Sequence, residues 1–199
     1  MKAVLYEERS QSSKSGRVTI AAFVCVLVGC MLYTTYKSVT AGGVYLSEYF
    51  IEIVSLLVLG KQAAGSYVYR LTDDSLLIEE KTLWRSKSWH VPYALIDGVY
   101  EYRREMSGPL KFRYKYRKAG ATDPRKVRAL AYAVPSGRDM KHGRVLIKAE
   151  DAFFEILDRF VPGRVLVPQE DVAYYALIRA EASKRGETPE AYMKASELK

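Results

Sequence analysis

The chain has 199 residues, of which 49% are hydrophobic, and its formal net charge is +8 at pH 7. The apolar content excludes disorder throughout, and the basic excess favours anionic partners such as lipid headgroups, nucleic acid or acidic proteins. Cys25 and Cys30 are the only cysteines, and His90 and His142 are the only histidines. Because both cysteines lie in an apolar segment, we expect no disulfide framework and no cysteine zinc site in the rest of the chain. Two histidines are too few for a metal site built on several imidazoles, and we expect no cofactor.

The first apolar segment runs from Val18 to Tyr36 and contains nineteen residues without a charge. At about 1.5 Å rise per residue, a helix of this length matches the ~30 Å of hydrocarbon in a bilayer. Arg17 and Lys37 bracket it. The pattern predicts a membrane helix at 18–36, preceded by an N-terminal tail at 1–17.

A second apolar run, at 44–60, follows the Gly42-Gly43 dipeptide and includes a narrow polar stripe of Glu48, Glu52 and Ser55. Two interpretations stay open. The run is either a second membrane helix whose stripe faces the first helix or a partner chain, or an amphipathic helix in the interface. In the first case 18–60 forms a helical hairpin, and the positive-inside rule places both termini in the cytoplasm.

The segment Leu27-Val28-Gly29-Cys30 also fits the pattern at which bacterial lipoproteins are cleaved and acylated on cysteine. This interpretation would move the rest of the chain outside the cytoplasm. The apolar run continues past Cys30, and a four-residue pattern in an apolar helix is easily met by chance.

From residue 65 onward, the periodicity changes to short alternating runs that predict strands, with a turn at Asp73-Asp74 between the first two. The runs cover 66–71, 75–81, 82–91, 98–103, 110–118, 126–134 and 144–149. Residues 150–160 predict an amphipathic helix, and 163–199 a further helix with a charged tail. We therefore expect an α+β domain at 65–162, a bent antiparallel sheet or barrel of about seven strands capped by a helix.

The segment at 110–118 reads LKFRYKYRK, with basic residues on one face and apolar residues on the other. The predicted contact surface for anionic lipid or a partner comprises Arg103, Arg104, Lys111, Arg113, Lys115, Arg117, Lys118 and Lys126. A basic residue near an anionic membrane contributes about 1 kcal/mol. The alternative is that these side chains solvate the outer face of a sheet. Nucleic acid is disfavoured, because the aromatic residues lie on the opposite face from the charges.

The sequence contains no phosphate-binding glycine loop and no GxSxG motif. His90 beside Trp89 is interpreted as a packing residue rather than a base, and Asp73-Asp74 as a turn rather than a cation site. The sequence therefore predicts a protein without catalytic activity.

Three segments resemble the bacterial pleckstrin-homology-like (PH-like) domain proteins. YRLTDDSLLI at 69–78 is similar to their opening hairpin, VPYALIDGV at 91–99 to a proline-led turn that feeds a strand, and 151–160 to their closing helix. Many bacterial members also have one or two membrane helices before the domain. The resemblance covers 18–162 and implies a protein of the bacterial cell membrane that binds headgroups, peptides or partner proteins.

The sequence thus predicts a membrane-anchored binding or scaffolding module, with a cytoplasmic domain that contacts a protein partner or an anionic lipid surface. The alternative is an accessory subunit of a membrane transport or secretion complex, in which the anchor helices contact other chains. A homo-oligomer is compatible with both hypotheses.

Overall fold

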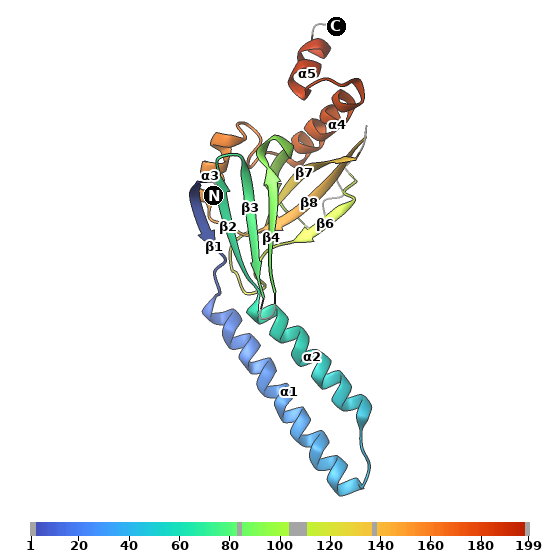
Figure 1. Cartoon of the computed structure of the whole chain (residues 1–199). Coiled ribbons are helices and arrows are strands. Elements are labelled where there is room, and N and C mark those ends of the chain that lie inside the picture. The colour runs from blue at the N-terminus through green and yellow to red at the C-terminus, as the bar shows by residue number, and fades with distance from the viewer. Residues whose placement is uncertain (1–2, 83–84, 104–110, 137–138, 198–199) are drawn as a thin grey trace.

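The computed structural model describes residues 3–82, 85–103, 111–136 and 139–197 (Figure 1). Two long helices project from one end of a β-rich domain, and the two C-terminal helices lie toward its other end. The fold is α+β, as the sequence predicts.

The projecting helices are α1 (Lys14–Ala41, 28 residues) and α2 (Leu46–Ala64, 19 residues). Ser13 caps α1 by accepting a hydrogen bond from the Gly16 N–H at 2.9 Å, and Gly42 ends it in a left-handed conformation with φ of 65°. Within the described part of the chain, α1 is the one helix long and apolar enough to cross a membrane. Its length is about 42 Å, against about 28 Å for α2.

Strand β1 (Val4–Arg9) lies in the segment that was expected to be a tail. It pairs antiparallel with β2 (Ser66–Thr72), so that Glu7 lies opposite Arg70. The two helices are therefore an insertion between paired strands. The sequence gives little sign of β1, because its pairing partner comes only after both apolar helices.

Two four-stranded sheets make up the domain, in the orders β1-β2-β3-β4 and β5-β7-β8-β6. The remaining strands are β3 (Ser75–Lys81), β4 (Ser86–Pro92), β5 (Ile96–Glu101), β6 (Tyr114–Arg117), β7 (Arg128–Ser136) and β8 (Asp139–Ile147). A short 3-10 turn, η1 (Tyr93–Leu95), connects β4 to β5. As predicted, Asp73-Asp74 joins β2 to β3.

The sheets differ from the predicted single bent sheet in three respects. β1 is an additional strand, β6 pairs parallel with β8, and the described strands form two sheets rather than a closed barrel. Within the described part of the run at 110–118, the paired residues are Tyr114–Arg117. Its strict alternation indicates a half-buried strand but cannot specify the partner or the direction of pairing.

Helix α3 (Asp151–Phe160) closes the core as the sequence predicts. Phe153, Phe154 and Leu157 are fully buried, and the Phe153 ring packs against Tyr69 with 6.0 Å between ring centroids. Large apolar side chains from both sheets complete the core: Leu71, Leu76, Ile78, Ile96, Leu130, Val145 and Ile147.

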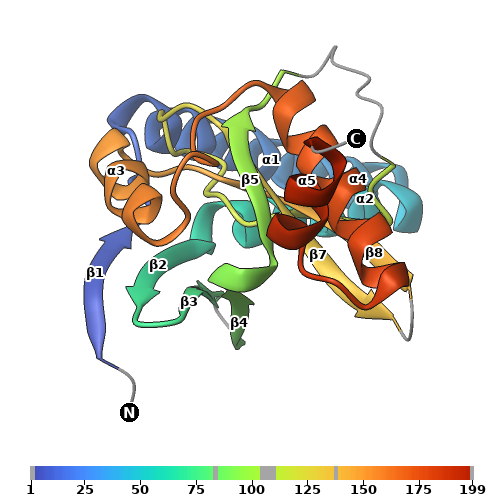
Figure 2. The same ribbon diagram turned by 90° about the horizontal axis from the view of Figure 1, so that it is seen from above.

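Helix α4 (Gln169–Arg185) packs on the second sheet and is followed by α5 (Pro189–Glu197). Figure 2, viewed from the end opposite the hairpin, shows α4 beside β5 and β8. The helix approaches β5 closely at Gly98, where an added Cβ would lie 2.7 Å from a methyl group of Val172. Only glycine fits this approach.

Candidate membrane-proximal binding site

The base of the domain, where the hairpin joins it, is held by hydrogen bonds between distant segments. The Ser10 N–H donates to the Tyr67 carbonyl at 2.7 Å, and the Ser13 N–H donates to the Thr122 carbonyl at 3.0 Å. The loop that follows β6 therefore lies against the start of α1. These contacts fix the hairpin to the base of the domain.

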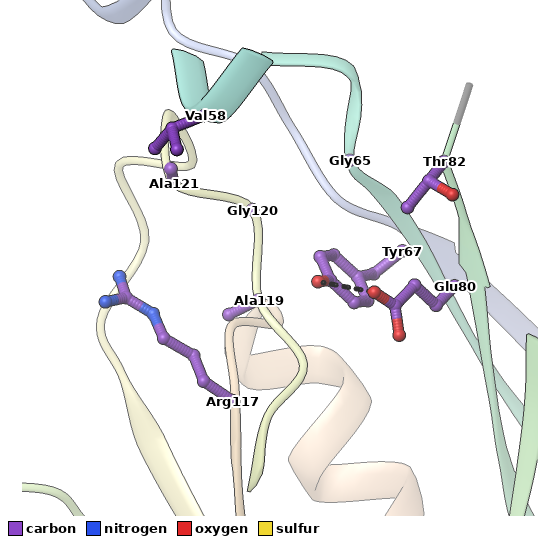
Figure 3. Close-up of a pocket in the computed structure, with 9 residues that line it drawn as sticks. All are labelled: Val58, Gly65, Tyr67, Glu80, Thr82, Arg117, Ala119, Gly120 and Ala121. Carbon is purple, nitrogen blue, oxygen red and sulfur yellow. Dashed lines mark hydrogen bonds between the residues drawn. The ribbon is translucent and has the colours of Figure 1, made fainter. Parts of the chain in front are cut away.

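A cavity of about 420 Å³ opens at this base, between α2 and the domain (Figure 3). Its lining combines apolar, small and charged residues from α2, β2, β3 and the end of β6: Val58, Gly65, Tyr67, Glu80, Thr82, Arg117, Ala119, Gly120 and Ala121. The lining is amphipathic, because the apolar Val58 side chain of α2 and charged side chains of the domain share one space.

One wall of the cavity carries a balanced charge. The Tyr67 hydroxyl donates to Glu80 at 3.4 Å, and Lys118 donates to the other carboxylate oxygen of Glu80. Burial, together with the nearby Glu80 carboxylate, raises the pKa of the Tyr67 hydroxyl. This wall therefore has a neutral phenol and a carboxylate already paired with an ammonium group.

Arg117 forms the other wall. Its side chain is exposed, and no other side chain in the described part of the protein forms a hydrogen bond or ion pair with its guanidinium. Figure 3 shows the guanidinium directed away from Glu80. Arg117 is thus a cation at the cavity with its hydrogen-bond donors available.

Four residues of the predicted contact surface follow one another at or near β6. Lys111, Arg113, Lys115 and Arg117 are all exposed. At about 3.3 Å per residue, Lys115 lies roughly 7 Å and Arg113 roughly 13 Å from Arg117 along the chain. The stripe therefore leads away from the hairpin, and Arg117 is its member nearest the base.

The other four predicted residues have different surroundings. Lys118 forms an ion pair with Glu80, and the Arg103 guanidinium lies 3.8 Å from the Glu101 carboxylate. Lys126 is exposed, whereas Arg104 lies outside the described residues. The described structure does not unite all eight residues in one patch.

The apolar face of β6 is also less buried than expected. Tyr116 is 44% exposed, although the alternation assigned it to the core. Its ring packs edge-on against Trp89 with 5.6 Å between centroids, and Trp89 also contacts Tyr132 at 5.1 Å. Tyr116 therefore packs where β4 meets the second sheet, at the rim of the core.

Sequence reasoning missed part of a basic collar around the base. We define this collar as the exposed residues Lys14, Arg17, Lys81, Arg85, Lys87 and Arg117. Lys81 pairs with Ser66, two residues after the end of α2. The Thr82 N–H donates to the Arg85 carbonyl at 2.9 Å, between β3 and β4. This segment was predicted as the start of a strand, so its charges were not assigned to the base.

The polar stripe of α2 faces α1. Glu52 accepts a hydrogen bond from the Thr34 hydroxyl at 2.9 Å, and Glu48 accepts one from Lys37 at 2.8 Å. Thr34 is 2% and Glu52 is 8% exposed, and Ser55 is half-buried. The two helices therefore pack through polar contacts while their other faces stay exposed.

A first buried ion cluster, which the sequence did not reveal, ties β1 to the domain. Arg125 binds both Glu8 and Asp123, and Glu8 also accepts a hydrogen bond from the Glu150 N–H at 2.8 Å. Burial raises the pKa of Glu8. Burial alone would also raise the pKa of Asp123, but hydrogen bonds from Arg125 and from the Gln11 N–H outweigh it and lower that pKa.

A second buried cluster ties α4 to the second sheet. Asp97 accepts a hydrogen bond from His142 Nδ1 at 2.9 Å, and its other oxygen lies 3.0 Å from Arg179 Nε. Arg179 also donates to the Ile96 carbonyl at 3.1 Å. These residues come from β5, β8 and α4, so no local pattern brings them together. Their arrangement holds the helix on the sheet.

Comparison of the chain with models of protein families, with curated proteins and with solved structures finds no match. The class of protein is therefore defined by its own architecture. It is an α+β domain with two helices inserted between its first two strands, and the first of these helices is long and apolar enough to span a membrane.

Proposed function

We propose that this chain is a membrane-anchored, PH-like binding or scaffolding module without catalytic activity, whose basic collar rests on an anionic leaflet. The observation that carries the proposal is the position of the collar. It surrounds the point at which two exposed apolar helices leave the domain.

The exposed surface of the hairpin supports the anchor. It includes large apolar side chains on both helices: Val18, Phe23, Val26, Leu32, Val39, Phe50, Ile51, Ile53, Leu57 and Val58. A contiguous apolar surface of this kind requires lipid or another protein to cover it. The length of α1 matches a bilayer with residues to spare.

The pairing of β1 with β2 supports two crossings. Both strands belong to one sheet, so a chain that crosses with α1 returns with α2. Cleavage before Cys30, as in a lipoprotein, would remove β1 and its buried Glu8. A hairpin with the collar on the domain side places the domain in the cytoplasm by the positive-inside rule.

The collar supports contact with anionic lipid. Its six cations lie at the level where headgroups would surround the hairpin, and each contributes about 1 kcal/mol within a Debye length of about 8 Å. The upper part of the β6 stripe lies farther from the base. The proposal therefore assigns membrane contact to the collar and leaves Lys111 and Arg113 as solvated residues.

The PH-like part of the proposal rests on two sheets closed by α3 and on the hairpin at Asp73-Asp74. The parallel pairing of β6 with β8 is a departure from the antiparallel sheet that the resemblance implies. The module would act by binding, because the two buried ion clusters of the described residues hold β1 and α4 on the domain.

A protein partner is the second candidate function, in which the chain is a subunit of a membrane complex. Tyr174 and Leu177, one turn apart on α4, are 65% and 52% exposed. They lie on the helix that covers the second sheet, away from the hairpin. Glu52 faces α1 and is 8% exposed, so a second chain would contact the exposed apolar faces of the hairpin instead.

Lysine labelling of the full chain in nanodiscs tests contact with the leaflet. Anionic phospholipid should reduce the reactivity of Lys81 and Lys87 toward an amine reagent, relative to neutral nanodiscs, because nearby phosphates stabilise the ammonium form. Lys111 serves as the control within the same molecule, and 0.5 M salt should remove the difference. Equal changes at all three lysines, or none, would contradict the proposal.

A further inference from the structure

We propose that the cavity between α2 and the domain binds one anionic phospholipid from the leaflet that holds the hairpin, with Arg117 binding its phosphate. This inference rests on the proposed function, since it requires the base of the domain to lie at the membrane surface. It goes further by assigning one cavity, one ligand class and one binding residue.

The shape of the cavity fits a headgroup. Its volume of about 420 Å³ lies in the range of small-molecule pockets. Gly65, Ala119, Gly120 and Ala121 line it with small side chains, which leaves backbone within reach of a ligand. The loop that carries Ala119, Gly120 and Ala121 is held in place, because Asp123 at its end accepts hydrogen bonds from Gln11 and Arg125.

The charges favour a phosphate at Arg117. A guanidinium offers a fork of donors that matches phosphate oxygens, and such charge-assisted bonds are stronger than neutral ones. Glu80 lies on the other wall, where Lys118 and the Tyr67 hydroxyl already bind its carboxylate. An anion beside Arg117 therefore does not face an unpaired carboxylate.

The anchor side of the cavity favours a lipid over a soluble anion. Val58 lines the cavity and is 49% exposed, and Val54, one turn earlier on α2, is 41% exposed. These side chains continue from the cavity along the apolar face of the helix. A ligand with a phosphate at Arg117 and an acyl chain along Val58 and Val54 satisfies both parts of the lining.

Native mass spectrometry of the full chain released from nanodiscs tests the assignment. We expect one phosphatidylglycerol to stay bound to each wild-type chain, and phosphatidylcholine not to. Arg117→Gln should lower retention about tenfold or more, as expected for the loss of a charge-assisted pair. The matched control is Arg113→Gln, which removes the same charge from the same stripe and should retain the lipid.

A second variant tests the cavity itself. Ala121→Trp fills the space from an exposed position without changing charge, and it should also reduce retention; a thermal melt of each variant verifies its folding. Equal loss in Arg117→Gln and Arg113→Gln would overturn the site in favour of general surface charge. Displacement of the lipid by millimolar inorganic phosphate would overturn the assignment of a phospholipid to the cavity and indicate a soluble anion as its ligand.

The two proposals fail in distinguishable ways. If wild type retains no lipid while Lys81 and Lys87 still respond to anionic nanodiscs, the cavity assignment is wrong and the leaflet contact stands. If those lysines do not respond either, both proposals are wrong.

Discussion

Ser10 and Tyr67 form two hydrogen bonds although 57 residues separate them in the chain. The Ser10 N–H donates to the Tyr67 carbonyl at 2.7 Å, and the Tyr67 N–H donates to the Ser10 hydroxyl at 2.9 Å. This pair closes the end of the β1–β2 ladder, where a tight turn would otherwise connect the strands. The hairpin of α1 and α2 takes the place of that turn.

Excision of the hairpin should therefore leave a folded domain. Replacing residues 11–66 by Asn-Gly joins Ser10 to Tyr67 through a two-residue turn, whose twist matches that of paired antiparallel strands. We expect a monomeric, water-soluble protein with the near-ultraviolet circular dichroism of a packed core. Gel filtration and spectroscopy without detergent provide the measurement.

A plain truncation that begins at Ser66 is the informative contrast. It removes the whole of β1, so that the edge of β2 loses its pairing partner, and it removes the contacts of Glu8 with Arg125 and with the Glu150 N–H. It also removes Tyr6, whose ring packs against that of Phe153 with 6.2 Å between ring centroids. Equal stability of the truncated and excised proteins would show that β1 is dispensable.

Asp123 should make stability depend on acid pH. Its pKa in the folded protein lies below the ordinary value of 3.8, so its contribution is complete above that pH and is lost as the pH falls through the folded pKa. Asp123→Asn should cost about 1.5–3 kcal/mol at neutral pH, and the difference should shrink below about pH 4. Urea unfolding across this range measures it.

Glu8 provides a control of opposite sign. Its folded pKa is raised above 4.5 by burial, so the folded state binds its proton more tightly and the protein loses stability as the pH rises through that pKa. The free energy of unfolding of wild type, relative to that of Glu8→Gln, should fall as the pH rises above 4.5. If the difference in unfolding free energy from wild type changed with pH in the same direction for Asp123→Asn and Glu8→Gln, the opposite pKa shifts of the two carboxyl groups would be contradicted.

The Asp97–Arg179 pair should hold α4 on the second sheet. Asp97→Ala leaves Arg179 buried without its acid, which should lower the free energy of unfolding by about 3–5 kcal/mol. Amide hydrogen exchange should accelerate in α4 before it does in β7. Glu155→Ala, which removes an exposed carboxyl from α3, should stay within about 0.5 kcal/mol of wild type.

Thr34 and Glu52 should couple the two apolar helices. Thr34→Val removes the donor to a buried carboxylate and should destabilise the hairpin by about 0.6–1.7 kcal/mol in unfolding titrations in mixed micelles. Thr40→Val is the control, because the Thr40 hydroxyl donates within its own helix at 3.0 Å. A double-mutant cycle that combines Thr34→Val with Glu52→Ala and gives no coupling energy would show that this hydrogen bond does not stabilise the hairpin.

The elements predicted well from sequence are those with a local signal. Helix α3 matches 150–160 because its apolar face and acidic start lie within ten residues, and Asp73-Asp74 specifies the turn between β2 and β3. Strand β1 was not predicted, because its six residues of mixed polarity show no local strand pattern and form a strand by pairing with β2. The sheet order likewise depends on pairings that no local period encodes.

The candidate site could be predicted only in part for the same reason. The alternation of 110–118 predicts Arg117 as one of several residues on a basic face, but Val58, Tyr67 and Glu80 approach it only once the hairpin and the first sheet are assembled. The distinction between Arg117 and Arg113, identical in the pattern, comes from their distance to the hairpin. Tertiary placement alone decides which cation belongs to the cavity.

Under the proposed function, the insertion of α1 and α2 between β1 and β2 also sets an order of events. During synthesis β1 leaves the ribosome first and has no partner until both apolar helices and then β2 have followed. A nascent chain whose second helix fails to return leaves β1 on one side of the bilayer and β2 on the other. Completion of the first sheet thus makes folding of the domain conditional on correct insertion of the hairpin.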